Sequence, residues 1–177
     1  MSLIDHPLLF ELWKEAQEKA SDEWASAGFW VHLWSKHIFW EKEWAIAQEG
    51  PPEGTGRRRV DVKIRRLAGD NNFTVLAFHE SKLLDASPKE VQEAETQAKD
   101  ACKLFIEQSK DQSFVYAITS FGTKARAWVY EKEGDGFKSF FGSDVEADRK
   151  EYIEAHSTDA SYLRRAFIKM KNDPPIL

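Results

Sequence analysis

Two neighbouring stretches of the chain carry apolar residues at the spacing of β-strands. In residues 60–67 valine and isoleucine alternate with charged residues, and residues 73–81 are apolar almost throughout. Because side chains alternate between the two faces of a strand, the first stretch predicts a strand with one buried face, and the second a central strand covered on both faces. Residues 69–72 between them are glycine, aspartate and asparagine, which favour turns. The two strands are therefore predicted to pair as a hairpin.

Both ends of the chain carry apolar residues at helical spacing instead. Near the N-terminus the pattern predicts two helices within residues 7–44, the second interrupted near Gly28. Near the C-terminus it predicts two more within residues 145–170, over Val145–Ala155 and Thr158–Met170. These helices are predicted to be additions at either end of a central core.

The segment after the hairpin begins with a helix start signal. Ser87 is a predicted N-cap, Pro88 suits the first turn, and Glu90 completes a capping box, so we expect a helix from there to about Ser109. The apolar runs that follow are rich in aromatic and β-branched residues. They predict three further strands, over residues 114–120, 125–131 and 137–141.

This order of elements predicts an α/β (α+β) fold with a central mixed β-sheet flanked by helices. A chain of 177 residues is most simply one domain, residues 1–177, with its core at about residues 30–131. No internal repeat, low-complexity tract or interdomain linker interrupts the sequence.

Charged side chains meet where the hairpin ends. Along the second strand Leu76, Phe78, Glu80 and Lys82 share one face, which brings a carboxylate and an ammonium group side by side. When the two strands pair, Asp61 can lie near Glu80. Two carboxylates and a lysine in one small volume outline a site for a divalent metal ion.

The order of Asp61, a strand, a turn and a second strand that ends in Glu80-Ser81-Lys82 resembles the D…(D/E)-x-K signature of the PD-(D/E)XK nuclease superfamily, which has the restriction-endonuclease-like fold. The resemblance implies a metal-dependent nuclease that hydrolyses phosphodiester bonds in nucleic acid. Mg2+ or Mn2+ would be held by Asp61 and Glu80, with the Ser81 carbonyl as an additional ligand, because Mg2+ prefers oxygen ligands. Lys82 would orient or help to deprotonate the attacking water and offset charge on phosphorus.

The same resemblance points to two further residues. A glutamate on or just after the first helix often joins the metal site in this superfamily, and Glu43 is the candidate here. It can equally be a solvated residue at the start of a first strand over residues 44–47. Several branches place a glutamine of the crossover helix at the active site, which Gln97 matches in position, although an exposed helix glutamine is the simpler interpretation. His79 is expected to be a hydrogen-bonded histidine under a helix and not a zinc ligand.

Tryptophan is concentrated in the N-terminal part of the chain. Trp30 and Trp34 are one helical turn apart, as are Trp40 and Trp44, so their rings can line up in a stripe. Such a stripe can be a platform on which bases stack, or it can pack in the core or at a dimer interface. Packing is the favoured interpretation because aromatic residues at helical spacing usually face inward.

The charge balance and the cysteine count narrow the class of protein. A formal net charge of −5 argues against a general nucleic-acid coat protein. A nuclease can still be acidic if its cleft is locally basic, and Arg57, Arg58 and Arg59 near Asp61 are candidates for substrate binding, or solubilising charges. Cys102 is the single cysteine, which excludes an intramolecular disulfide and favours an intracellular setting, cytoplasmic or nuclear. No apolar run is long enough to span a bilayer, so no membrane partner is expected.

A second hypothesis keeps the fold without the catalysis. The acidic net charge and the tryptophan-rich N-terminal half also fit a catalytically inactive nuclease-fold module, which binds a second copy or a protein partner through its N-terminal helices. Nucleic acid is the expected partner if the chain is active. An inactive module has no chemical need for Asp61, Glu80 and Lys82 together, which favours the enzyme.

Overall fold

The computed structural model describes residues 2–50, 60–69, 71–134 and 136–175. Within these ranges the chain forms a seven-stranded sheet with the strand order β1-β2-β3-β4-β5-β6, and a short β7 pairs with β5. The pairs β1–β2, β2–β3, β4–β5, β5–β6 and β5–β7 are antiparallel and the central pair β3–β4 is parallel, so the sheet is mixed. The strands are β1 (Trp44–Gly50), β2 (Val60–Leu67), β3 (Phe73–Lys82), β4 (Phe114–Phe121), β5 (Lys124–Glu131), β6 (Phe137–Ser139) and β7 (Ile153–Glu154).

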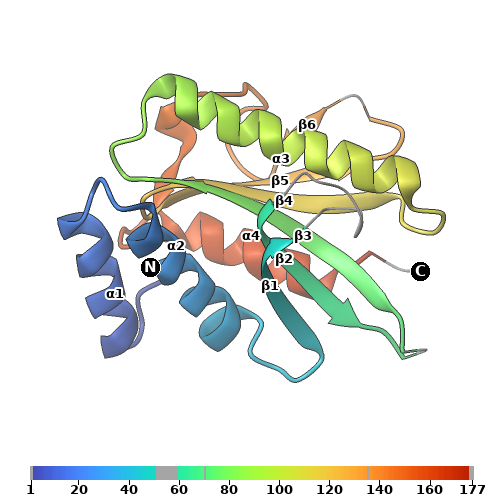
Figure 1. The fold of residues 1–177 in the computed structure, drawn as a ribbon, viewed down its shortest axis with the longest axis horizontal. Helices are drawn as coiled ribbons and strands as arrows, with labels where there is room; N and C mark the ends of the chain where they lie inside the picture. The colour runs from blue at the N-terminus through green and yellow to red at the C-terminus, as the bar shows by residue number, and fades with distance from the viewer. Residues whose placement is uncertain (1, 51–59, 70, 135, 176–177) are drawn as a thin grey trace.

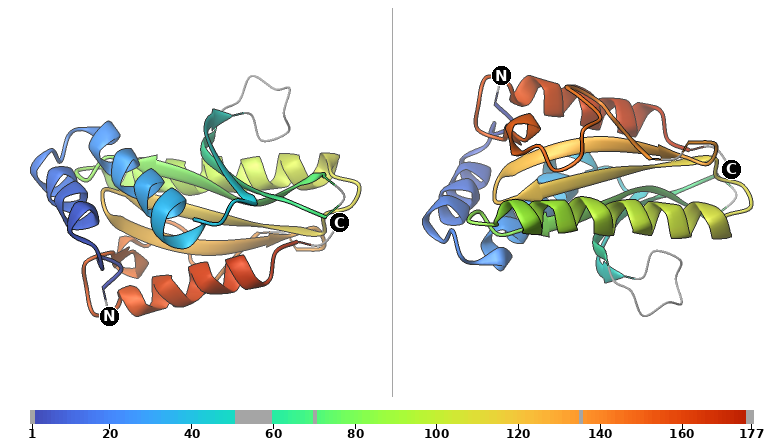
Figure 2. Two further views of the ribbon diagram at one scale, coloured as in Figure 1. Left: turned by 90° about the horizontal axis from the view of Figure 1, so that it is seen from below. Right: turned by 90° about the horizontal axis from the view of Figure 1, so that it is seen from above.

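Helices cover both faces of this sheet (Figure 1). The four α-helices are α1 (Pro7–Glu18), α2 (Glu23–Leu33), α3 (Pro88–Gln108) and α4 (Ala160–Asn172). In Figure 2, α3 runs along one face of the sheet and α4 along the opposite face, with α1 and α2 gathered at one end. The predicted α/β (α+β) class with a central mixed sheet flanked by helices is therefore confirmed.

The two largest clusters of buried apolar residues lie on the two sides of the sheet. The larger core joins α1, α2 and α4 to one face and includes Trp30, Trp34 and Phe167. The smaller core lies under α3, where Phe78 and Cys102 pack together. The buried indole of Trp30 also donates a hydrogen bond from Nε1 to the Gly122 carbonyl oxygen at 2.7 Å, which fixes α2 against the turn between β4 and β5. No helix in the described part of the chain is long and apolar enough to cross a membrane.

The hairpin and the crossover helix form where the sequence predicts them. The strands β2 and β3 pair antiparallel, and α3 connects β3 to its parallel neighbour β4. Ser87 accepts a hydrogen bond from the Glu90 backbone N–H, and the Glu90 carboxylate accepts one from the Ser87 N–H at 2.7 Å, so the predicted capping box is present. This cap fixes the start of α3 a few residues after Lys82.

The N-terminal helices differ from the prediction. Helix α2 is not interrupted at Gly28; it continues to Leu33 and passes into a π-helical turn, η1 (Trp34–Ile38). Trp30 and Trp34 are stacked with ring centroids 5.4 Å apart and are fully buried, which confirms the packing interpretation for this pair. Trp44 instead begins β1, so it shares no helical face with Trp40, and the strand alternative at residues 44–47 is the correct one.

The predicted helix Val145–Ala155 is wrong. This segment has only a 3-10 turn, η2 (Arg149–Glu151), followed by β7. The buried guanidinium of Arg126 donates hydrogen bonds to the carbonyl oxygens of Ser143 and Val145, the former a short one. The Glu95 carboxylate accepts another short hydrogen bond, from the Ala147 N–H. Side chains from β5 and α3 thus form hydrogen bonds with backbone carbonyl and N–H groups that would otherwise be available for hydrogen bonds within a helix.

Candidate functional site

Asp61 is tied directly to the end of the neighbouring strand. It lies near the start of β2, and its Oδ2 accepts a hydrogen bond from the backbone N–H of Ser81 at 2.7 Å. The pairing of β2 with β3 in antiparallel register brings these two positions together. The sequence expectation that Asp61 lies beside the Glu80-Ser81-Lys82 segment is met for Ser81.

The side chains of this segment point to opposite sides of the sheet. Lys82 Nζ donates a hydrogen bond to Gln97 Oε1 on α3 at 3.2 Å. Glu80 is almost fully buried, and its charge helps burial to raise the pKa of Cys102, which also lies on α3. Glu80 and Lys82 therefore face α3, as strand alternation predicts, together with Phe78. Leu76 packs in the core on the opposite side of the sheet, so the prediction that it shares their face is wrong. Gln97 meets Lys82 instead of projecting alone into solvent.

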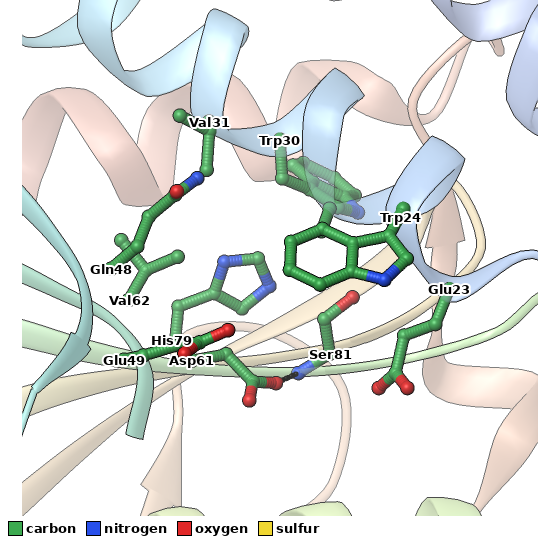
Figure 3. Close-up of a pocket in the computed structure, with 11 residues that line it drawn as sticks. Glu23, Trp24, Trp30, Val31, Gln48, Glu49, Asp61, Val62, His79 and Ser81 are labelled. Atoms are coloured by element: carbon green, nitrogen blue, oxygen red, sulfur yellow. Dashed lines mark hydrogen bonds between the residues drawn. The ribbon is translucent and has the colours of Figure 1, made fainter. Parts of the chain in front are cut away.

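Ser81 faces the other way, into a pocket between α2 and the first three strands. The pocket has a volume of about 180 Å3, and α2, β1, β2 and β3 all contribute side chains to it. Figure 3 shows the Ser81 hydroxyl beneath the indole of Trp24, with His79 beside it and Asp61 at the rim. Asp61 is thus shared between this pocket and the α3 side, because the charge of Lys82 also acts on it.

The imidazole of His79 lines the pocket and has a defined hydrogen-bonding state. Trp34 Nε1 lies 3.1 Å from His79 Nδ1, and an indole nitrogen can only donate, so Nδ1 accepts and the ring proton is on Nε2. His79 Nε2 lies 2.8 Å from Ser120 Oγ, to which it therefore donates. Burial lowers the pKa of His79 to about 3, which agrees with this neutral state. The expectation of a partnered, buried histidine is confirmed.

Three carboxylates from three elements line the pocket. They belong to Glu23 at the start of α2, Glu49 in β1 and Asp61 in β2. Burial raises the pKa of Glu23, and the charge of Asp61 raises it further. Burial also raises the pKa of Asp61, to which Glu49 adds and which the Ser81 hydrogen bond and Lys82 oppose. A cation at this point would relieve the repulsion between these carboxylates.

Of the remaining predicted site residues, Glu43 lies away from this place. Glu43 lies in the turn before β1, where its carbonyl oxygen accepts a hydrogen bond from the Leu67 N–H at 2.8 Å. Leu67 ends β2 and Asp61 lies near its start, about 20 Å away at the usual rise of a strand. Glu43 is therefore at the opposite end of the hairpin from Asp61. Arg57, Arg58 and Arg59 lie outside the described residues.

Glu23 and Trp24 are the residues that sequence reasoning missed. Asp22 accepts a hydrogen bond from the Trp24 N–H at 2.9 Å and so caps α2, which places Glu23 in the first turn of the helix. An Asp N-cap before an apolar helical run was the available signal. It would have located the start of α2, but not the direction in which Glu23 points.

The donor set at the end of β3 suits a hard divalent cation only in part. Among the residues with a described position, no group of three or more His, Cys, Asp or Glu side chains is arranged to hold a metal ion. The oxygen donors that the sequence resemblance implies are the Asp61 and Glu80 carboxylates and the Ser81 carbonyl. Mg2+ is commonly bound through one or two carboxylates together with substrate phosphates, so the set fits that mode of binding.

No family model matches this chain, and no curated protein matches it. Among solved structures, the chain is similar to a chain in the cryoEM structure of the DrdV–DNA complex, with a TM-score of 0.45 and 14% sequence identity. The similarity covers 93% of this chain and 14% of that chain. The functional conclusion must therefore come from the geometry at the end of β3.

Proposed function

We propose that this chain is a metal-dependent phosphodiesterase of the PD-(D/E)XK type that acts on nucleic acid. The observation that carries the proposal is the convergence of Asp61, Ser81, Lys82 and Gln97 at the end of β3. The order of elements supports it, because a helix, three antiparallel strands, a crossover helix and a parallel strand follow one another. The core of the superfamily that the sequence resembles has a helix, a sheet entered through the hairpin with the signature, a crossover helix and a further strand.

Asp61 and Glu80 would hold Mg2+ or Mn2+, with the Ser81 carbonyl as a third oxygen donor. When bound, the ion supplies positive charge for the phosphate and lowers the pKa of a coordinated water. The hydrogen bond from the Ser81 N–H fixes one oxygen of Asp61, so this carboxylate has a set orientation. The raised pKa of Asp61, caused first by burial, marks a carboxylate whose ionised form gains from a nearby cation.

Lys82 is the residue that would act on the attacking water. Its hydrogen bond to Gln97 Oε1 keeps the Lys82 ammonium at the end of β3, where it would orient the water and offset charge that develops on phosphorus. Gln97 Nε2 in turn donates a hydrogen bond to Glu93 Oε1 on the same helix at 3.4 Å, so the Gln97 amide has a preferred orientation. Gln97 is therefore assigned a positioning role through Lys82.

Glu23 replaces Glu43 in this proposal as the helix carboxylate that lines the pocket together with Asp61. The charge of Asp61 raises the pKa of Glu23 and the charge of Lys82 lowers it, so both groups are close enough to act on Glu23. Glu23 would accept hydrogen bonds from coordinated water and would not need to bind the ion directly.

The test is cleavage of labelled single-stranded and double-stranded DNA and RNA in the presence of Mg2+ or Mn2+. Glu80→Gln and Lys82→Met are each expected to lower the rate by about 100-fold or more, because they remove a metal ligand and the water-orienting group. Glu107→Gln and Lys103→Met, on exposed positions of α3, are the matched controls and should leave the rate unchanged. Circular dichroism establishes that each variant is folded.

Two outcomes would contradict the proposal. Full activity in Glu80→Gln would show that Glu80 is not a metal ligand. Absence of cleavage by the wild-type chain on all four substrates, at millimolar Mn2+, would leave the catalytically inactive module as the better description.

A further inference from the structure

The pocket beside Asp61 contains a hydroxyl group whose proton is available to a ligand. Ser120 Oγ accepts from His79, so it donates its own proton to Ser81 Oγ, 3.1 Å away. The structure gives the Ser81 hydroxyl no acceptor among the residues it describes. Since Trp34 sets the direction of this chain at its far end, Ser81 offers a fixed hydrogen-bond donor to the pocket.

The wall opposite Ser81 is an exposed indole. Trp24 is 73% exposed, whereas Trp30 and Trp34 on the same helical stretch are fully buried. In Figure 3 the Trp24 ring lies over Ser81 at one side of the pocket, with Gln48 and Val62 at the other. No ring contact to Trp24 occurs among the described side chains, so a face of this indole is open to a flat, aromatic ligand.

The charges around the pocket exclude a phosphate as its occupant. The lining includes the carboxylates of Glu23, Glu49 and Asp61, and no lysine or arginine is among the described residues that line it. Carboxylates accept hydrogen bonds from the amino groups of nucleobases, as they do when proteins read cytosine in DNA. An uncharged aromatic ring with donors and acceptors on its edge fits both the acidic rim and the hydroxyl of Ser81.

Ser81 also connects this pocket to the proposed hydrolytic site. Its backbone N–H binds Asp61 while its hydroxyl lies in the pocket, so a single residue contributes to both. We propose that the pocket lined by Trp24, Gln48 and Ser81 receives one unpaired nucleobase of the substrate, next to the phosphate that the metal ion at Asp61 and the ammonium group of Lys82 would hold. The proposal rests on the proposed function and specifies it: the substrate is single-stranded or locally unpaired at the site of cleavage.

The test uses single-stranded DNA and RNA oligonucleotides that carry one 2-aminopurine, without divalent metal so that no cleavage occurs. Stacking of this base on Trp24 should quench its fluorescence when the wild-type protein binds. Trp24→Ala should remove most of the quenching and weaken binding about 5- to 150-fold, the range that corresponds to the loss of one base–aromatic stack. Ser81→Ala should reduce both in the same direction.

The matched control is Trp40→Ala. Trp40 is 65% exposed but does not line the pocket, so this variant should bind and quench as the wild type does. An oligonucleotide with an abasic site at the central position should bind to the wild type and to Trp24→Ala with equal affinity. Equal quenching by wild type and Trp24→Ala would overturn the pocket assignment. Failure of the wild type to bind both the DNA and the RNA oligonucleotide with 2-aminopurine would overturn it as well.

Cleavage measured in parallel separates this proposal from the one on which it rests. If Mg2+-dependent cleavage depends on Glu80 but neither quenching nor affinity depends on Trp24, the base pocket is wrong and the hydrolytic function stands. If quenching depends on Trp24 and is unchanged in Glu80→Gln, while no metal supports cleavage, the function fails and the base-binding pocket stands.

Discussion

Two hydrogen-bond chains pass through the neighbouring residues Thr119 and Ser120 of β4 and end in different ways. On the α3 side, Trp128 Nε1 donates to Thr119 Oγ1 at 3.0 Å, Thr119 bonds to the Tyr152 hydroxyl at 2.8 Å, and Tyr152 donates to Glu95 at 2.7 Å. This closed chain ends on a buried carboxylate beside Arg126. On the α2 side, the open chain runs from Trp34 through His79 and Ser120 and ends on the Ser81 hydroxyl in the pocket.

The difference between these ends separates a structural network from a binding surface. Glu95 receives bonds from Tyr152 and Ala147 and has the guanidinium of Arg126 nearby, so its polar atoms are satisfied within the protein. The Ser81 hydroxyl still has a proton to give. Both chains begin at a tryptophan N–H, which can only donate, and this fixes their direction. The closed chain should therefore govern stability, and the open chain should govern what the protein binds.

The largest expected effect comes from breaking the closed chain at Arg126. Arg126 and Glu95 are both fully buried, and Nη1 lies 3.7 Å from Glu95 Oε1. Arg126→Met keeps the aliphatic stem but leaves a buried carboxylate without its cation, which typically destabilises a protein by about 3–5 kcal/mol. Urea unfolding at pH 7 measures the change. The exposed Lys132→Met should change the unfolding free energy by less than about 0.5 kcal/mol.

The double variant Arg126→Met/Glu95→Gln sharpens this prediction. If the loss in the single variant comes from the uncompensated charge of Glu95, the double variant should recover part of the stability. A double variant no more stable than Arg126→Met would assign the loss to the hydrogen bonds that Arg126 donates to Ser143 and Val145.

Protonation of His79 at low pH should disrupt the open chain, because a protonated Nδ1 cannot accept the hydrogen bond from Trp34. Burial lowers the pKa of His79 from its ordinary 6.5 to about 3 in the folded protein. Below pH 6.5 the unfolded chain therefore binds a proton that the folded protein does not, and stability falls as the pH falls, until it levels off near pH 3. One such proton corresponds to a slope of about 1.4 kcal/mol per pH unit.

His79→Gln isolates this contribution because glutamine does not titrate. Unfolding free energies of the wild type and of His79→Gln, measured between pH 7.5 and pH 4.5, should converge as the pH falls, since only the wild type carries the His79 penalty. Parallel pH profiles for the two proteins would show that His79 is not held neutral by the fold.

The elements that the sequence predicted well are those set by neighbouring residues. Ser87, Pro88 and Glu90 define the start of α3 by contacts within one turn. The alternating residues of β2 and the apolar run of β3 define the hairpin. The segment 145–155 failed for the opposite reason. Its backbone groups are bound by Arg126 and Glu95, and neither residue is close enough in sequence for any local pattern to reveal the contact.

The candidate site divides in the same way. Strand spacing placed Glu80 and Lys82 on one face and brought Asp61 to the neighbouring segment, which needs only a hairpin. The roles of Trp24 and Glu23 depend on where α2 lies against the sheet. That position is set by buried contacts such as Trp30 with Gly122, 92 residues apart. Helical periodicity identified Trp30 and Trp34 as buried, but it could not show that Trp24 overhangs a pocket.

The smallest expected effect on stability, and the one of opposite sign, comes from Asp61 at the rim of the open chain. Burial raises the pKa of Asp61 in the folded protein, so between its unfolded and folded pKa values the folded protein keeps a proton that the unfolded chain has lost. Stability therefore falls as the pH rises through that window, and the full penalty remains above it. Asp61→Asn removes the charge and can still accept the bond from the Ser81 N–H.

In EDTA at pH 7, Asp61→Asn should unfold at a higher urea concentration than the wild type, and this difference should vanish as the pH falls below 3.8, the ordinary pKa of the unfolded carboxyl. Added Mg2+ should stabilise the wild type by binding to its folded state and should not stabilise the variant. Glu107→Gln is the charge-matched control and should follow the wild type in both media. A variant less stable than the wild type at pH 7 would mean that Asp61 is held for the fold. Greater stability together with the loss of cleavage would mean that the carboxylate is kept, at the expense of stability, for the site at the end of β3.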